Sequence, residues 1–522
     1  MTRPIDELPA RPSLPASTRA PGRPSDWGSL VADLSRGRDE PTFHVHDKTH
    51  LELAIDYRLR GESALESFVW EAYFFAPESL RLDQRTYDKS DIYTDLQSYV
   101  RFEVPEVGFG ELCLEPIDKV RTALEGGDEK AAIREMRLFA CQVRAAGVEL
   151  RQHIVDALDQ GEAERARAEA AAVRMAKDSR LLTEKLREAL APAEGRGDPI
   201  RTAALWVDED ISRLIETLLA NLSRRLTQVG AAPSLIELVE RTAITEAQRR
   251  AESGIGRIGR LDMSPREIEA LEFRRHLLKR FTSSVLWLSP EVRPASTWVR
   301  ELLYAVAAAV AMAFAIGAAV WNGFQIGSEG WLTWVLVGVV AYAVKDRIKA
   351  LLQSKFSTVV ERHFPDRRWR IRDRERSVVL GEMNEQSGFV AMADLPKPVL
   401  AARRMTRRHE LEEQARPETV LFHKKEVTVR AQRVADADPR FQALTEIFRL
   451  DVSRWLAHTD DPKREIVFAD PIAGRIGSAR APRVYNLAVV FRLQRQGDAA
   501  AGWHRLRVVV SRKGIRRVER IA

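Results

Sequence analysis

The sequence predicts a multi-domain membrane protein that combines β structure, an α-helical bundle and a two-helix transmembrane hairpin. Three observations predict this class. The run Leu302–Trp321 holds 20 residues without one charge, about the length that a helix needs to cross the hydrocarbon core. Apolar residues follow heptad spacing over much of 133–189, and they alternate with polar residues in the N-terminal and C-terminal parts. The chain has 522 residues, more than a single core usually holds.

Charge is unevenly distributed along the chain. The net charge is +7, but residues 345–522 hold 38 Lys and Arg against 23 Asp and Glu. This excess predicts an anionic partner for the C-terminal part. Cys113 and Cys141 are the only cysteines, which argues against a disulfide scaffold and favours a reducing compartment.

The N-terminal part is predicted as a tail followed by a small β-hairpin element. Residues 1–40 are rich in Pro and Arg, lack the apolar core of a signal peptide, and are expected to be disordered. Within 41–110, apolar residues alternate over His50–Arg60, as in a half-buried strand. The aromatic run Phe68–Phe75 is typical of a strand buried on both faces. We expect these two strands to pair with each other.

Residues 111–253 are predicted to form an antiparallel helical bundle. Apolar residues from Ile133 to Ala157 are spaced alternately by three and four, the seam of a heptad, and the pattern resumes after Gly161. Two helices of about 30 residues joined by a turn make a coiled-coil hairpin, and two further helices complete the bundle. Its exposed faces could bind a cytoplasmic protein partner. Residues 254–300 are expected to form a glycine-rich linker and a juxtamembrane helix.

The transmembrane hairpin is predicted over 301–344, with spans at about 302–321 and 326–346. The loop between the apolar runs has no Lys or Arg, whereas Lys345, Arg347, Lys349 and Lys355 follow the second run. Lys and Arg collect on the cytoplasmic side, so both large domains are expected in the cytoplasm of a cell with a bacterial-type inner (plasma) membrane. The alternative is a hairpin buried in a soluble core. The second run has only 14 residues, which leaves open whether it spans fully.

Small residues recur every four positions along the first span, at Ala305, Ala309, Ala313 and Gly317. Such a stripe allows close packing of helices in lipid, against the second span or against another copy. A homo-oligomer is therefore an open alternative.

Two segments follow the hairpin. Residues 345–376 are predicted as a basic amphipathic helix whose cations contact anionic lipid headgroups. Residues 377–522 are predicted as a cytoplasmic α+β domain with strands near 420–429, a helix carrying Leu444 and Phe448, and a closing antiparallel meander. Aromatic residues of the meander share a side with aliphatic ones, which makes nucleic acid an unfavoured partner.

Few residues point to chemistry. His44, His46 and His50 form the densest group of metal-ligand types, but their spacing matches no zinc pattern, and exposed histidines are the preferred interpretation. Gly126-Gly127-Asp128-Glu129 is best explained as a helix N-cap. No phosphate-binding loop, metalloprotease or nucleophile-elbow motif occurs, so no catalytic residue and no cofactor is predicted.

The resulting hypothesis is a membrane-tethered scaffold or regulatory protein. One alternative is a subunit of a homo-oligomeric channel, although the loop resembles no selectivity filter. A second alternative is a membrane-bound enzyme of unknown reaction, which would require a cleft with perturbed acid and base groups.

Overall fold

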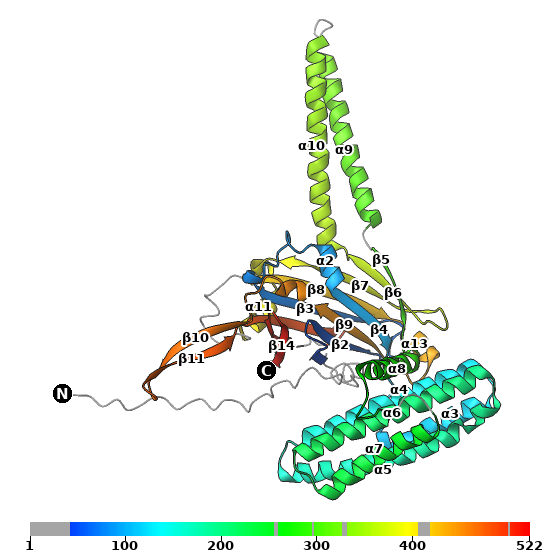
Figure 1. Ribbon diagram of the computed structural model, residues 1–522. Coiled ribbons are helices and arrows are strands. Elements are labelled where there is room, and N and C mark those ends of the chain that lie inside the picture. The colour runs from blue at the N-terminus through cyan, green and yellow to red at the C-terminus, as the bar shows by residue number, and fades with distance from the viewer. Residues whose placement is uncertain are drawn as a thin grey trace.

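The computed structural model describes residues 42–254, 259–294, 297–325, 331–405, 418–498 and 502–521. It is a mixed structure of helices and antiparallel sheets. The predicted tail and the tip of the apolar hairpin lie outside these residues. A β-sandwich forms the centre, a helical bundle lies at one end, and the α9–α10 hairpin projects from the other end (Figure 1).

The larger sheet of the sandwich has eight strands in the order β14-β13-β12-β3-β8-β7-β6-β5. Its strands are β3 (Glu66–Pro77), β5 (Ser289–Pro294), β6 (Arg367–Arg372), β7 (Val379–Val390), β8 (Glu418–Val429), β12 (Tyr485–Arg495), β13 (His504–Ser511) and β14 (Gly514–Arg520). The short helices α11 (Lys397–Met405) and α13 (Ala431–Ala437) flank β8 in the chain.

The smaller sheet has the order β1-β2-β9-β4. Its strands are β1 (Thr42–Val45), β2 (His50–Arg58), β4 (Leu96–Phe102) and β9 (Ala443–Asp451), with the short helices α2 (Lys89–Asp95) and α14 (Ser453–Leu456) beside them in sequence. One apolar core combines side chains of both sheets, and Trp70 packs on Phe448 across the gap with ring centroids 4.8 Å apart.

Backbone hydrogen bonds join the two sheets at both edges. The Phe102 amide donates to the Leu286 carbonyl at 2.9 Å beside β5, and the Ile515 amide of β14 donates to the Lys48 carbonyl at 2.6 Å. Both long edges of the sandwich are thereby partly covered, which protects them from pairing with other chains.

The predicted pairing of the two N-terminal strands is wrong. β2 pairs with β1 and β9, and β3 pairs with β8 and β12, so segments from both ends of the sequence share each sheet. Phe68, Trp70 and Phe74 of β3 are buried in the core between the two sheets, but residues of its other face, such as Val69 and Tyr73, are only half-buried, so the predicted burial on both faces holds for only part of the strand. A single hairpin partner could not have covered it on both edges.

Two other predicted helices are wrong in type or extent. The segment with Leu444 and Phe448 is strand β9 of the small sheet, and both of its faces are buried, so its sequence lacks the alternation that marks a half-buried strand. The basic helix predicted over 345–376 ends at His363, and Arg367–Arg372 is strand β6. In β6 the alternate residues Trp369 and Ile371 are buried, a period of two.

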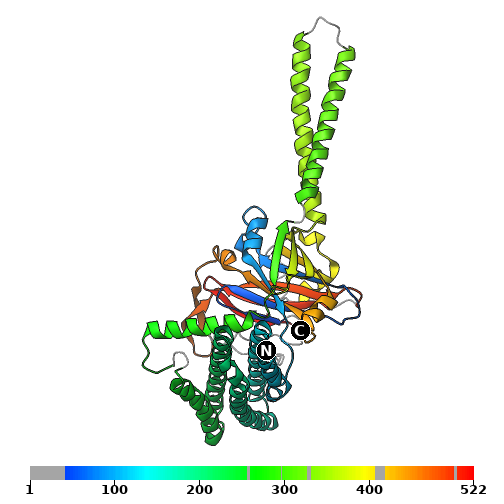
Figure 2. The same cartoon turned by 90° about the vertical axis from the view of Figure 1, so that its right-hand side faces the viewer.

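The helical bundle is inserted between β4 and β5. Its helices are α3 (Glu115–Glu125), α4 (Glu129–Ala157), α5 (Glu162–Leu190), α6 (Asp198–Gln228), α7 (Pro233–Glu252) and α8 (Pro265–Ser283). The two long helices expected from the heptad spacing are α4 and α5, of 29 residues each, and Asp128 caps α4 as predicted. The helix expected beside the membrane, α8, instead packs on α4 and α6, at the bundle end of the molecule (Figure 2).

The apolar hairpin is a second insertion, between β5 and β6. Its helices α9 (Thr297–Gln325) and α10 (Trp331–His363) lie side by side and extend away from the sandwich (Figures 1 and 2). Among the described residues, one helix is long and apolar enough to cross a membrane, Glu301–Trp321, with a mean hydropathy of 2.2. The second span stays a prediction.

Candidate functional site

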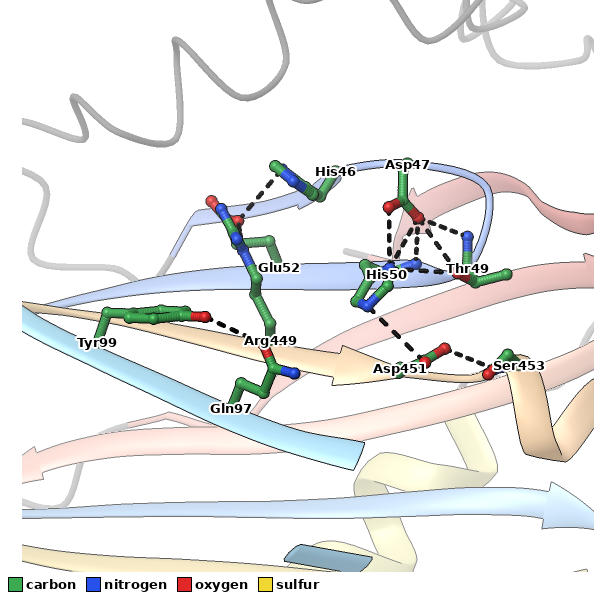
Figure 3. A network of polar contacts seen from close by, with 10 residues as sticks. All are labelled: His46, Asp47, Thr49, His50, Glu52, Gln97, Tyr99, Arg449, Asp451 and Ser453. Carbon is green, nitrogen blue, oxygen red and sulfur yellow. Dashed lines mark hydrogen bonds and ion pairs between the residues drawn. The ribbon is translucent and has the colours of Figure 1, made fainter. Parts of the chain in front are cut away.

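The histidine-rich segment forms a polar cluster where the β1–β2 turn meets the end of β9 (Figure 3), and His46 and His50 are half-buried there rather than exposed as expected. We call it the histidine clasp: His46, Asp47, His50, Glu52, Arg449 and Asp451. Asp47 shapes the turn, because its Oδ1 accepts hydrogen bonds from the amides of Thr49 at 2.7 Å and His50 at 2.8 Å. Partial burial would raise the pKa of Asp47, but these amides and the His50 ring lower it to about 2.

His50 lies between two carboxylates. Its Nδ1 is 2.9 Å from Oδ2 of Asp47, and its Nε2 is 3.8 Å from Oδ2 of Asp451. The ring is 27% exposed, so solvent reaches it.

Glu52 anchors the other half of the clasp in the interior. This fully buried carboxylate is 3.4 Å from Nδ1 of His46 and accepts a hydrogen bond from Nε of Arg449. The Arg449 guanidinium in turn lies 5.5 Å from the ring centroid of Tyr99. Burying such a carboxylate requires these partners.

The histidines do not converge on one point. His46 and His50 approach different carboxylates, with ring centroids 6.4 Å apart, and the side chain of His44 lies outside the described residues. Within the described part of the chain, no three His, Cys, Asp or Glu residues are arranged to hold a metal ion.

The clasp instead fastens together segments distant in sequence. The Thr49 carbonyl accepts from the Val452 amide at 2.9 Å, and Lys48 accepts from Ile515. Gly514 has φ +117°, and a Cβ built there would lie 2.2 Å from the Lys48 carbonyl oxygen, so only glycine fits this approach. These contacts join the N-terminal turn to the C-terminal strands.

A second polar cluster, which sequence reasoning missed, lies inside the sandwich. Lys425 is 1% exposed and pairs with the buried carboxylates of Glu446 and, at 3.3 Å, Glu385. Tyr57 donates to Glu446 at 2.6 Å, and Trp369 donates to Glu385 at 2.9 Å. Burial alone would lower the pKa of Lys425, but the two carboxylates raise it above its ordinary value.

The interior cluster also contains a serine, a histidine and a carboxylate that lie in a row, each within contact distance of the next. Ser387 Oγ is 2.6 Å from Nδ1 of His423, whose Nε2 is 3.5 Å from Glu385. Burial, and next the Lys425 charge, hold the pKa of His423 well below its usual range, so the ring is neutral. Each of these three residues is less than 3% exposed, so a substrate cannot reach the serine. Lys425 could have indicated this cluster in the sequence, because it alternates with Val427 and Val429 along a strand and so shares their buried face.

The bundle carries an open cleft of about 700 Å³ between the loop before α3 and helices α4 and α5. Its polar lining is mostly acidic: Glu106, Glu111, Glu149, Asp178, His153 and Arg174. Its wide opening to solvent suits a partner segment more than a small molecule enclosed on most sides.

The predicted membrane contacts lie on the α9–α10 hairpin. Arg347, Lys349 and Lys355 are exposed, whereas Lys345 is half-buried, with Nζ 3.9 Å from the Tyr342 ring centroid. On α9, Ala307 and Ala311 are buried within the hairpin. The stripe of Ala305, Ala309, Ala313 and Gly317 is exposed and faces away from α10.

No protein-family model matches the chain, and neither the curated proteins nor the solved structures include a match to it. Its function therefore has to be inferred from its own residues.

Proposed function

We propose that the chain is a membrane-anchored scaffold, with α9–α10 inserted as a two-span anchor and the sandwich and bundle held in the cytoplasm. The observation that carries the proposal is the exposure of large apolar side chains around the hairpin. On α9 these include Val310, Phe314, Ile316 and Trp321, and the apolar window of this helix is only 11% buried. A hairpin inside a soluble core would have these side chains covered.

The lengths of the two helices support insertion from the tip. At 1.5 Å per residue, Lys349 stands about 27 Å from the start of α10, close to the thickness of the hydrocarbon core. Lys345 and Arg347 then fall in the last turn, where long side chains reach the headgroups. These cations favour a cytoplasmic location for the end of the hairpin next to the sandwich, and contact there with anionic lipid headgroups.

The site of insertion supports a role as an anchor rather than as part of the core. β5 and β6 form a ladder that places Pro294 opposite Arg367, so the two ends of the hairpin leave the sheet side by side. A hairpin attached in this way adds nothing to the core of the sandwich. It holds the sandwich at a fixed distance from the bilayer.

Removal of the hairpin tests the proposal directly. We replace residues 295–365 with Asn-Gly, which closes β5 on β6 in a three-residue loop and keeps Asp366 with its partners Lys89 and Tyr93. Wild type should stay in the membrane fraction after carbonate extraction, and the deletion variant should be soluble and resist trypsin. A folded deletion variant that still sediments with membranes would contradict the proposal.

Topology requires a separate experiment. Reporter fusions at Gly327 and after Ala522 should report opposite sides of the membrane. Fusions that both report the cytoplasm would leave the hairpin as a surface-lying or soluble element. Replacing Lys345, Arg347, Lys349 and Lys355 by Gln should disturb this orientation, because the bias of Lys and Arg is then lost.

A pore-forming oligomer is the second candidate. Ala305, Ala309, Ala313 and Gly317 form a stripe that α10 leaves uncovered, and small residues allow helices of different copies to approach closely. Ala309→Leu and Ala313→Leu should abolish conductance in bilayers if copies assemble through this stripe, whereas the anchor function should be unaffected.

A further inference from the structure

The strands β10 (Lys463–Asp470) and β11 (Arg475–Pro482) form a two-stranded ribbon that belongs to neither sheet of the sandwich. We call this ribbon the β-arm. It reaches out from the body of the molecule (Figure 1). Nearly every residue of both strands is exposed, on both faces. Among the described residues, each strand pairs only with the other.

The β-arm exposes an unusual amount of apolar surface. Val467 is 67% exposed, Ile476 77% and Ile472 at the tip 98%, and Ile466 and Phe468 are each 47% exposed. An isolated two-stranded ribbon is marginally stable in water, and a further strand or a covering surface is needed to stabilise it. Exposed apolar strands with free edges are surfaces for pairing with another chain.

The two edges of the β-arm differ in their chemistry. The β11 edge ends in Pro482 and carries Arg475 and Arg480 without any acidic residue, so two such edges would repel each other. The β10 edge begins with Lys463 and Arg464, ends with Asp470, and has apolar residues in its centre. Two antiparallel copies of β10 would therefore match in charge.

One register of two paired β10 strands places opposite charges against each other and also keeps facing side chains on the same side of the sheet. In an antiparallel pair related by a two-fold axis, residues that face each other must point to the same side of the sheet. With the axis at Val467, each Arg464 faces Asp470 of the other copy, and each Ile466 faces Phe468. Val467 faces its own counterpart. This register gives an opposite-charge pair at each end and apolar pairs between them.

We propose that the β-arm binds a second copy of this chain through β10, forming a four-stranded sheet in the order β11-β10-β10-β11 with Val467 on the two-fold axis. Asp470 fits this role, because its Oδ1 already fixes the turn by accepting from the amides of Ile472 at 2.9 Å and Ala473 at 3.0 Å. The pairing needs no membrane. Confinement of the chain to a membrane strengthens it, because the second copy is then at high effective concentration.

Disulfide trapping of the full chain in its own membranes tests the register. Directly opposed residues on neighbouring strands are about 5 Å apart, within reach of a disulfide, whereas residues on the two outer strands are three strand spacings apart. Val467→Cys should form a disulfide-linked dimer on mild oxidation. Ser478→Cys is the matched control, since Ser478 faces Val467 within one copy and would lie on an outer strand. It should stay monomeric.

The native cysteines do not interfere with this experiment. Cys113 and Cys141 are buried, and burial raises the pKa of both thiols, that of Cys141 to about 12. A mixture of Ile466→Cys and Phe468→Cys chains should cross-link more than either variant alone, which no other register predicts. Val467→Cys that stays monomeric, or Ser478→Cys that cross-links equally, overturns the proposal.

A charge on the axis provides the complementary test. Val467→Lys places two like charges against each other and should reduce the dimer fraction at least tenfold in chemical cross-linking. Ser478→Lys places the same charge on the same face of the sheet, but on the outer strand β11, and should change the dimer fraction less than twofold. An equal loss in both variants would assign the contact to another surface of the β-arm and overturn the pairing through β10.

Discussion

Arg440 holds Glu135 with two parallel hydrogen bonds, from Nη1 at 2.6 Å and from Nη2 at 2.7 Å, and this pair joins the sandwich to α4 of the bundle. Asp438 accepts from the same guanidinium at 2.8 Å and lies 3.5 Å from Arg134. Bidentate pairs of this kind fix orientation as well as distance. The bundle therefore has a defined attachment to the sandwich.

Arg440→Met should loosen this attachment. The substitution leaves the buried Asp438 and the half-buried Glu135 without their principal cation, at a cost of about 1–3 kcal/mol. Limited chymotrypsin digestion should cut the connections around residues 103–114 and 284–288, at sites such as Phe109 and Trp287, several-fold faster than in wild type. Arg241→Met is the control, because its pair with Glu237 is exposed on one helix and should leave the digestion unchanged. Equal digestion of both variants would refute the role of Arg440.

Gly514→Ala should destabilise the sandwich at the histidine clasp. A Cβ would lie 2.2 Å from the Lys48 carbonyl oxygen, a backbone atom that cannot rotate away, at a φ of +117°. Strain and loss of the Ile515 hydrogen bond should together cost several kcal/mol, and the melting temperature should fall by 10 °C or more. Gly497→Ala also carries a positive φ, of +97°, but meets no atom within 4 Å. Gly497→Ala should therefore cost only about 1 kcal/mol. A similar loss of stability in both variants would mean that the positive φ, and not the contact with Lys48, causes the loss.

Lys425→Met should be far more damaging than the same change at the next residue. Removal of the buried cation leaves the carboxylates of Glu446 and Glu385 uncompensated in the core, which typically costs 3–5 kcal/mol. Lys424 is the matched control, because its side chain is 36% exposed and pairs with the exposed Glu426. Lys424→Met should change the free energy of unfolding by less than about 0.5 kcal/mol. Denaturant unfolding of the purified full chain in detergent measures both.

Asp56 should make the stability of the sandwich depend on pH. Burial, and next the charge of Glu103, raise the pKa of Asp56 to about 7, although Thr445 donates to it at 2.7 Å. The folded state therefore holds a proton that the unfolded state loses near pH 4. The associated stability is present below that pH and is lost as the pH rises through 7.

Asp56→Asn tests this dependence. The amide keeps the shape and can accept from Thr445 without a charge, so the variant should unfold at higher denaturant than wild type at pH 8. The gain is up to about 4 kcal/mol at 1.36 kcal/mol for each pKa unit. At pH 4 the two proteins should differ little. A constant difference across this range would mean that Asp56 does not titrate between pH 4 and pH 8.

Local features of the fold could be predicted from the sequence because their causes are local. Heptad spacing located α4 and α5, Asp128 identified the start of α4, and the charge-free run located α9. The aromatic run of β3 indicated a strand buried on both faces, but over most of its length only one face is fully buried and the other is half-buried.

Partners distant in sequence could not be predicted in the same way. Nothing in the composition of β2 or β3 specifies that β9 and β12, from beyond the hairpin, will pair with them. The helix expected around Leu444 is wrong because both faces of β9 are buried by segments distant in sequence, which removes the alternation that marks a half-buried strand. Of the candidate residues, His46 and His50 were found by their density, but one carboxylate partner of His50, Asp451, lies some 400 residues away in the sequence.

The central position of β3 has a consequence for biosynthesis. β3 leaves the ribosome early, whereas β8 and β12, its two neighbours in the sheet, follow only after the bundle and the apolar hairpin have been made. Non-local pairings of this kind form slowly and expose strand edges in the meantime. The bundle and the apolar hairpin are therefore synthesised before the sandwich can close, and a chain that ends before β12 leaves one edge of the aromatic strand β3 unpaired.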